Sequence, residues 1–198
     1  MNATGYAIGQ YKGLLTNGFY NTQEELNNRP FNSYSANARL GDIKFRDITG
    51  DGIINDQDLV PIGYSNLPQV SYNLSVGFSY KGFDVSALFI GTAKGSFPQY
   101  DYILSSPYAK GVGQVLQYAY DGHWTQEKYN NKQPIYYPAV SFSGGQGNNT
   151  RLSDFWLKSN DFQRLKNLEM GYSFSQAGFL ARANIKAIRV YLNGNNLV

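Results

Sequence analysis

The feature that most constrains the fold is a strict alternation of apolar and polar residues from Ser71 to Tyr80. Successive side chains of a β-strand point to opposite faces, so this alternation predicts a strand with one apolar and one polar face. The pair Lys81-Gly82 follows at once, and glycine eases the positive φ that a tight hairpin turn requires. A second strand is therefore predicted from Phe83 to Thr92, with a less regular pattern on its polar side.

Similar alternation returns near the end of the chain. Residues 161–174 and 185–197 predict two further strands, and residues 5–15 predict a weaker one. Residues 93–160 show no lasting period, apart from a short helix expected near 112–120. Strands of about ten residues have the length that a tilted strand needs to cross a bilayer.

Two all-β architectures satisfy this pattern. Outer-membrane barrels join their strands by short turns on one rim and long loops on the other. The turn at Lys81-Gly82 and the long aperiodic segment match these two kinds of connection. A secreted, soluble β-sandwich that binds glycans alternates in the same way, with its apolar face inward. The loop asymmetry and the tyrosines at strand ends favour the barrel, since tyrosine prefers the lipid–water boundary. The predicted fold class is all-β: part of a large antiparallel transmembrane β-barrel with long extracellular loops and short periplasmic turns.

The number of strands predicts that the chain is a piece of such a barrel. About five strands fall short of the eight in the smallest barrels, and an open sheet in lipid would leave its edges unsatisfied. The first six residues carry neither the basic nor the apolar region of a secretory signal, so we expect any export signal to lie upstream.

The amino-acid composition excludes several classes of function. Aromatic residues make up 16% of the chain and charged residues only 16%, which suits a barrel with one apolar and one wet face. The absence of cysteine excludes disulfides, thiolate zinc sites and a cysteine nucleophile. The net charge of +3 comes without a dense Lys/Arg block, so no nucleic-acid partner is expected. His123 is the only histidine, and no spacing selects a catalytic pair, so we expect no enzyme.

The segment from Asp47 to Asp58 has the oxygen spacing of a twelve-residue calcium loop, with Gly52 at the sharp turn. Calcium is therefore the cofactor that this loop would accommodate, although none is required. The alternative is a turn in which Asp and Asn side chains cap their own backbone, with Gly50 and Gly52 supplying the bends. The candidate calcium ligands are Asp47, Thr49, Asp51, Ile53 through its carbonyl, Asn55 and Asp58.

Two further residue sets are candidates for binding surfaces. Aromatic rings in the long aperiodic segment would stack on sugar faces, or else pack the loop against itself or a partner. The candidates to face a ligand or partner are Tyr100, Tyr102, Tyr108, Tyr120, Trp124, Tyr136 and Tyr137. The apolar stripes of the predicted strands would face lipid, and they comprise Tyr72, Leu74, Val76, Phe78, Leu168, Met170, Tyr172, Ile188 and Val190.

Several stretches in order resemble one family, the SusC/RagA-like TonB-dependent transporters of Bacteroidetes outer membranes. The resemblance covers most of the chain from about Gly9 onward and looks like the C-terminal third of the barrel domain. The family's plug domain and its final strand have no counterpart within residues 1–198. The stretches that carry the resemblance are GDIKFRDITGDGIINDQD (residues 41–58), IG (62–63), YKGFD (80–84), WT (124–125), DFW (154–156), RLKNLEMGY (164–172) and RVYLNGNNL (189–197).

The resemblance implies both architecture and partners. It implies a barrel of about 22 strands filled by a plug, located in the outer membrane of a Gram-negative cell. It implies a SusD-like surface lipoprotein as partner, energy from TonB–ExbB–ExbD through N-terminal regions outside this chain, and oligosaccharide or peptide as cargo.

Overall fold

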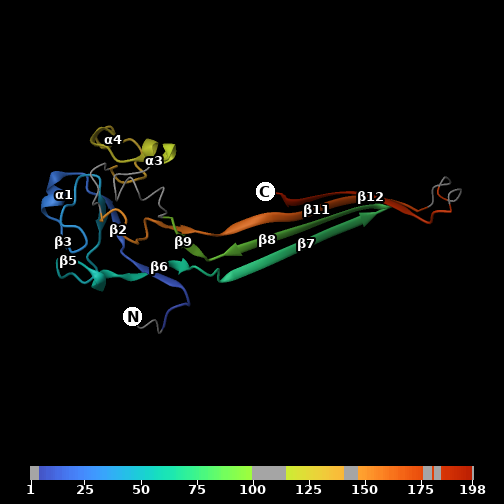
Figure 1. Cartoon of the computed structure of the whole chain (residues 1–198), viewed down its shortest axis with the longest axis horizontal. Helices are drawn as coiled ribbons and strands as arrows, with labels where there is room; N and C mark the ends of the chain where they lie inside the picture. Colours follow the sequence, from blue (N-terminus) through green and yellow to red (C-terminus); the bar gives the residue numbers. More distant parts are fainter. Residues whose placement is uncertain (1–4, 100–114, 141–146, 176–179, 181–183, 198) are drawn as a thin grey trace. The chain divides into compact units, whose positions relative to one another are not determined.

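The chain folds into two compact units. The computed structural model describes residues 5–99, 115–140, 147–175, 180 and 184–197. Unit 1 comprises Met1–Leu67 and Ser96–Ser159, and unit 2 comprises Pro68–Gly95 and Asn160–Val198 (Figure 1). Among the described residues, no helix has both the length and the apolar character needed to span a membrane.

Unit 2 is a single antiparallel sheet of four long strands in the order β12-β11-β8-β7. The strands are β7 (Val70–Tyr80), β8 (Phe83–Ala93), β11 (Phe162–Phe174) and β12 (Ile188–Leu197). They confirm the four strands predicted from the regular alternation. The β7–β8 hairpin turns at Lys81 and Gly82, both with positive φ (47° and 86°), as the left-handed backbone of a two-residue turn demands.

The register of the sheet gathers the predicted apolar residues on one face. Antiparallel partners share a face, and one row of partners runs Phe78–Val85–Met170–Leu192 across all four strands. The register shifts between Leu165 and Asn167 on β11, which absorbs one extra residue without reversing the faces of the rest of the strand. All residues of the predicted lipid-facing set therefore lie on this face, which we call the apolar face.

Unit 1 is built from short elements. Its strands are β1 (Gln10–Gly13), β2 (Thr16–Phe19), β3 (Phe31–Asn32), β4 (Ile43–Phe45), β5 (Ile53–Ile54), β6 (Val60–Ser65), β9 (Ser96–Pro98) and β10 (Leu157–Ser159). They form two-stranded pairs: β1–β6, β2–β4, β3–β5 and β9–β10. The helices are α1 (Gln23–Asn27), the 3₁₀ turn η1 (Asp56–Asp58), α3 (Gln117–Gly122) and α4 (Gln126–Asn130).

A buried core with a polar network holds unit 1 together. Leu14, Ile43 and Trp156 are almost fully buried in one hydrophobic cluster. Beside it, the amide of Asn149 accepts from the Ile43 N–H at 2.9 Å and donates to an Asp42 carboxylate oxygen at 2.8 Å. These bonds join residues more than 100 positions apart in sequence and satisfy polar groups that would be costly to bury alone.

Several expectations need correction or refinement. The weak strand predicted over 5–15 is only β1, over Gln10–Gly13, and the helix predicted near 112–120 is α3, over Gln117–Gly122. The described parts of the aperiodic segment are not an open loop, because they pack with the N-terminal residues into unit 1. The described residues form no closed barrel. Within unit 2 they also supply no second sheet over the apolar face, which the sandwich alternative requires.

Candidate functional site

An aromatic pocket lies among the predicted ligand-facing residues of unit 1. It has a volume of about 550 Å³ and is lined by Tyr118, Asp121, Gly122, Tyr136, Tyr137 and Lys158. The segment after α4 returns to α3, where the N–H groups of Tyr136 and Tyr137 both donate to the Gly122 carbonyl, at 2.8 and 3.0 Å. A side chain at position 122 would crowd Tyr136 and Tyr137, so glycine permits this close approach. The pocket thus presents tyrosine rings beside one carboxylate and one ammonium group.

The rings of this pocket differ in exposure. Tyr136 is exposed, whereas Tyr137 is half-buried with its ring 5.8 Å from that of Tyr118. Burial raises the pKa of the Tyr137 phenol above its ordinary value. A polar, aromatic pocket of this size could hold a sugar ring or a peptide side chain.

The structure places the other predicted aromatic residues elsewhere. Tyr120 is exposed beside the His123 ring and does not line the pocket. Trp124 is only 7% exposed, and its indole N–H donates to the Asn21 side chain at 2.9 Å. Its expected role in facing a ligand is therefore corrected to a structural one. Tyr100, Tyr102 and Tyr108 lie outside the described residues. Sequence reasoning missed Lys158, because nothing in the sequence relates β10 to α3.

The acidic segment folds as a turn that satisfies its own backbone. One oxygen of Asp47 accepts from the Gly50 N–H at 2.6 Å, and the other accepts from the Gly52 N–H at 2.7 Å. Asp58 is fully buried and accepts from the N–H groups of Ile48 and Asn55, at 2.8 and 2.9 Å. Burial raises the pKa of Asp58, but its backbone N–H donors outweigh this effect, so the pKa lies below the ordinary value.

This geometry favours the self-capped turn. Gly50 and Gly52 both have positive φ (74° and 81°), as the bends require. Asp58 has no exposed surface, and both its oxygens already accept hydrogen bonds, so it does not fit the role of a closing calcium ligand. Among the residues with described positions, no three His, Cys, Asp or Glu side chains gather in a way that could hold a metal. Calcium binding by this loop stays a prediction.

The two faces of the unit 2 sheet form the third candidate surface. On the apolar face, Tyr72, Leu74, Val76, Phe78, Met170, Tyr172, Ile188 and Val190 are exposed, and only Leu168 of the predicted set is half-buried. The opposite face carries Glu169 and Asn193 in one row. On that face, Arg189 lies 2.5 Å from an oxygen of Asp84 and 2.5 Å from an oxygen of Glu169, linking three strands. The sheet is therefore apolar on one side and polar, with paired charges, on the other.

No protein-family model matches the chain. Two TonB-dependent receptors of Formosa agariphila, P3 and P26, are 26% and 25% identical to it over 197 and 195 residues, covering 98% of this chain and 18% of each relative. A third receptor of that organism, P39, is 29% identical over 162 residues, covering 75% of this chain and 14% of the relative.

Solved structures of RagAB have a similar fold over most of this chain. The RagAB peptide transporter superimposes with a TM-score of 0.64 at 18% identity, over 96% of this chain and 18% of that chain. The RagAB peptide importer in its closed-closed state superimposes with a TM-score of 0.62 at 19% identity, over 96% and 19%. The resemblance predicted from the sequence is confirmed, and the chain fits a fragment of a TonB-dependent receptor. The chain spans less than a fifth of the length of these relatives.

Proposed function

We propose that this chain is the C-terminal portion of the barrel domain of an outer-membrane TonB-dependent transporter. The observation that carries the proposal is the two-faced sheet of unit 2, whose apolar face has exposed large apolar side chains on each of the four strands. An apolar surface this extensive is unfavourable in water. Acyl chains would cover it, while the polar face with Glu169 and Arg189 would border a water-filled passage.

Strand length and aromatic placement support the same environment. The four strands have 11, 11, 13 and 10 residues, close to the 9–11 or so that a tilted transmembrane strand needs. Tyr80 and Phe83 pair at the hairpin end of the apolar face, in a row with Tyr172. Aromatic side chains gathered at one end of an apolar band are typical of the girdles at membrane interfaces.

The proposed activity is nutrient uptake without covalent chemistry. We infer that the transporter imports oligosaccharide or peptide together with a SusD-like lipoprotein, and that TonB–ExbB–ExbD acts through regions outside this chain. Support comes from the similarity to TonB-dependent receptors and from the RagAB structures, which are named as a peptide transporter and importer. In this proposal Tyr136, Tyr137 and the exposed Tyr120 contact cargo or partner from unit 1.

Two adjacent substitutions on β7 test the orientation of the sheet. Val76 lies in the apolar face and Ser75 in the polar face, so Val76→Arg and Ser75→Arg add the same charge one residue apart. In lipid, Val76→Arg should destabilise the barrel by about 2–4 kcal/mol, whereas Ser75→Arg should change its stability little. Urea unfolding of the complete gene product, folded into phosphatidylcholine vesicles, measures both.

The opposite ranking, or a chain that stays soluble and monomeric without detergent, would refute the membrane assignment. Equal effects of the two arginines would also refute it, because they would mean that the two faces meet the same solvent.

A further inference from the structure

The sequence contains two Asn-Gly pairs, Asn17-Gly18 on β2 and Asn193-Gly194 on β12. In such a pair the backbone nitrogen of the glycine can attack the side-chain carbonyl carbon of the asparagine, because glycine has no Cβ to obstruct the approach. The attack requires the backbone to rotate out of its extended form. The local structure therefore decides which of the two pairs reacts.

The first pair lies where a ladder is interrupted. In the β2–β4 pairing, Asn17 and Gly18 together oppose the single residue Lys44, which is the arrangement of a β-bulge and disrupts the ladder locally. Gly18 has a positive φ of 78°, and a Cβ built there would meet nothing within 4 Å. Both residues of the pair are exposed, and the Asn17 amide has no hydrogen-bond partner among the described residues. The backbone here has room to rotate.

The second pair lies in a continuous ladder. Asn193 pairs with Glu169 and Gly194 pairs with Leu168, within an unbroken stretch of the β11–β12 register. A Cβ at Gly194 would lie 2.8 Å from the Leu197 side chain, so this backbone is both paired and crowded. Asn193 is nevertheless exposed, like the first asparagine. The two pairs therefore differ in backbone freedom and not in access to water.

The reaction needs no co-reactant other than water. The Gly18 nitrogen forms a bond to Cγ of Asn17, the bond from Cγ to the side-chain nitrogen breaks, and that nitrogen leaves as ammonia with the proton lost from Gly18. Water then opens the cyclic imide at either carbonyl carbon, which gives aspartate or isoaspartate. Nothing is oxidised or reduced, and the net result replaces a neutral amide by a carboxylate.

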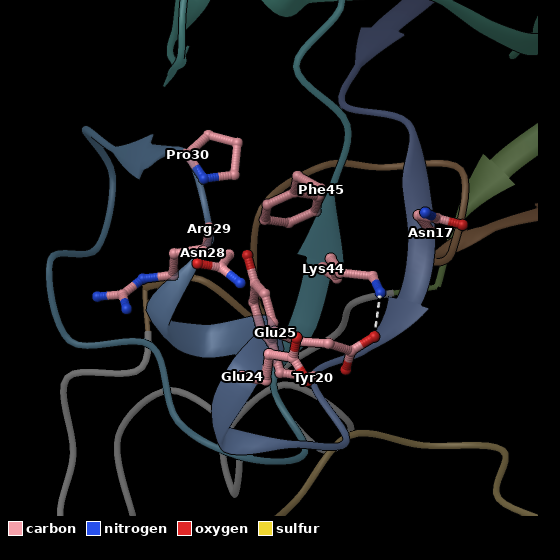
Figure 2. Close-up of a pocket in the computed structure, with 9 residues that line it drawn as sticks. All are labelled: Asn17, Tyr20, Glu24, Glu25, Asn28, Arg29, Pro30, Lys44 and Phe45. Atoms are coloured by element: carbon pink, nitrogen blue, oxygen red, sulfur yellow. Dashed lines mark hydrogen bonds and ion pairs between the residues drawn. The ribbon is translucent and has the colours of Figure 1, made fainter.

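A carboxylate at position 17 would join a group of charged side chains. Asn17 lines a pocket of about 410 Å³ together with Glu24, Glu25 and Lys44, and Figure 2 shows it on the strand beside the one that carries Lys44. The Lys44 ammonium group lies 2.7 Å from a Glu25 oxygen, and this pair joins α1 to β4. The Arg29 guanidinium, the other cation of the pocket, already donates to two backbone carbonyls. A third carboxylate would therefore compete with Glu25 for Lys44.

We propose that Asn17 is a site of spontaneous deamidation in the folded protein, and that the acid formed there loosens the attachment of α1 to β4. The bulge at Asn17-Gly18 makes this pair reactive, whereas the ladder protects Asn193-Gly194.

Ageing of the complete gene product in detergent, at mildly alkaline pH, tests the site. Peptide mapping by mass spectrometry measures the conversion of each asparagine, and protein isoaspartyl methyltransferase labels the isoaspartate. In the folded protein, position 17 should convert about tenfold faster than position 193, which corresponds to a barrier lower by about 1.4 kcal/mol. In concentrated urea the two rates should become similar, because the two dipeptides are identical.

Three results would overturn the proposed site. The first is no conversion at position 17 of the folded protein, and the second is equal conversion at positions 17 and 193. The third is a difference that persists unchanged in urea, since flanking residues and not the bulge would then set the rate.

Three variants test the effect on α1. Asn17→Asp supplies the new charge directly and should speed hydrogen exchange of the peptide covering 22–29 about threefold, as expected when an ion pair at a partly exposed site is weakened. Asn17→Gln keeps a neutral amide, and Asn193→Asp adds the same charge in unit 2, so both should leave this exchange unchanged. Unchanged exchange in Asn17→Asp, or an equal effect of Asn193→Asp, would overturn the link to α1. None of these results depends on membrane insertion, so they are independent of the transporter assignment.

Discussion

Unit 1 buries its large apolar residues in a core, whereas the strands of unit 2 leave many of theirs exposed. Unit 1 places Ile43 and Trp156 in a closed core and also buries Asp42, Asp58 and Asn149. In unit 2, by contrast, every residue of β7 is exposed, apolar and polar alike. Both units are rich in strands, so secondary structure does not distinguish them.

The alternation of apolar and polar residues in a strand therefore does not fix the environment of its apolar side. Unit 1 satisfies its apolar residues within itself and can bury carboxylates because N–H donors surround them. The four described strands of unit 2 form a single sheet without a second sheet against it, so both of its surfaces need a solvent. An apolar solvent on one side and water on the other is the arrangement that satisfies both.

Truncation of one apolar side chain in each unit should give the largest difference between the two units. Trp156 is 1% exposed and donates to the Asn149 carbonyl at 2.7 Å, so Trp156→Ala leaves a cavity and an unpaired acceptor. It should lower the local free energy of unfolding of unit 1 by about 3–5 kcal/mol. Hydrogen exchange with peptide-resolved mass spectrometry measures this loss separately in each unit.

Val76→Ala is the matching change in unit 2, where the side chain is 51% exposed. Fluid acyl chains leave no fixed cavity, so only a transfer difference of about 1 kcal/mol or less should remain. If Val76→Ala cost as much as Trp156→Ala, the apolar face would be a packed interior and the comparison would fail.

Sequence reasoning succeeded where the signal is local. Alternation over ten or more residues identified β7, β8 and β11 almost to the residue, because a period of two directly reflects strand geometry. The same alternation identified which side chains share a face, since pairing in register preserves it across strands.

Sequence reasoning failed where contacts are distant and elements are short. The β3–β5 ladder has two residues in each strand, too few for any period. The Asn32 side chain donates to the Asn148 side chain at 2.6 Å, although the two residues are 116 positions apart in sequence. No local sequence pattern predicts such a bond. Trp124 was misassigned for the same reason, because its partner Asn21 is 103 positions away. The aromatic pocket of unit 1 could not be located before these contacts were known.

A buried carboxylate provides the next test of the contrast. Asp58→Asn replaces an acceptor for three backbone N–H groups by an amide that matches them poorly, so unit 1 should lose about 2 kcal/mol at neutral pH. The pKa of Asp58 is lowered on folding, so its contribution is complete above its unfolded pKa of about 3.9 and disappears as pH falls through the folded value. The difference between wild type and variant should therefore shrink below about pH 4.

Hydrogen exchange of the peptide covering 47–58 gives this difference at each pH. Asp51→Asn is the control, because Asp51 is exposed and its one described contact is with the N–H of Ile53, two residues away. A variant difference that stayed constant between neutral and acidic pH would mean that the charge on Asp58 does not stabilise the turn.

Calcium should have the smallest effect, and it separates the two interpretations of the acidic turn. The oxygens of Asp47 and Asp58 already accept backbone N–H groups, so the turn is complete without a cation. We therefore expect a chelator to leave the hydrogen-exchange protection of residues 47–58 unchanged, and millimolar calcium to slow their exchange only slightly.

If the loop does bind calcium, chelation should reduce the protection of residues 47–58 and added calcium should restore it, with magnesium as the ionic-strength control. Asp47→Asn should then abolish the calcium effect, since it removes the ligand at the first position of the loop. A loss of protection that calcium alone reverses would therefore show that the segment is a metal site and not a self-capped turn. A cation would then stabilise part of the buried polar groups of unit 1.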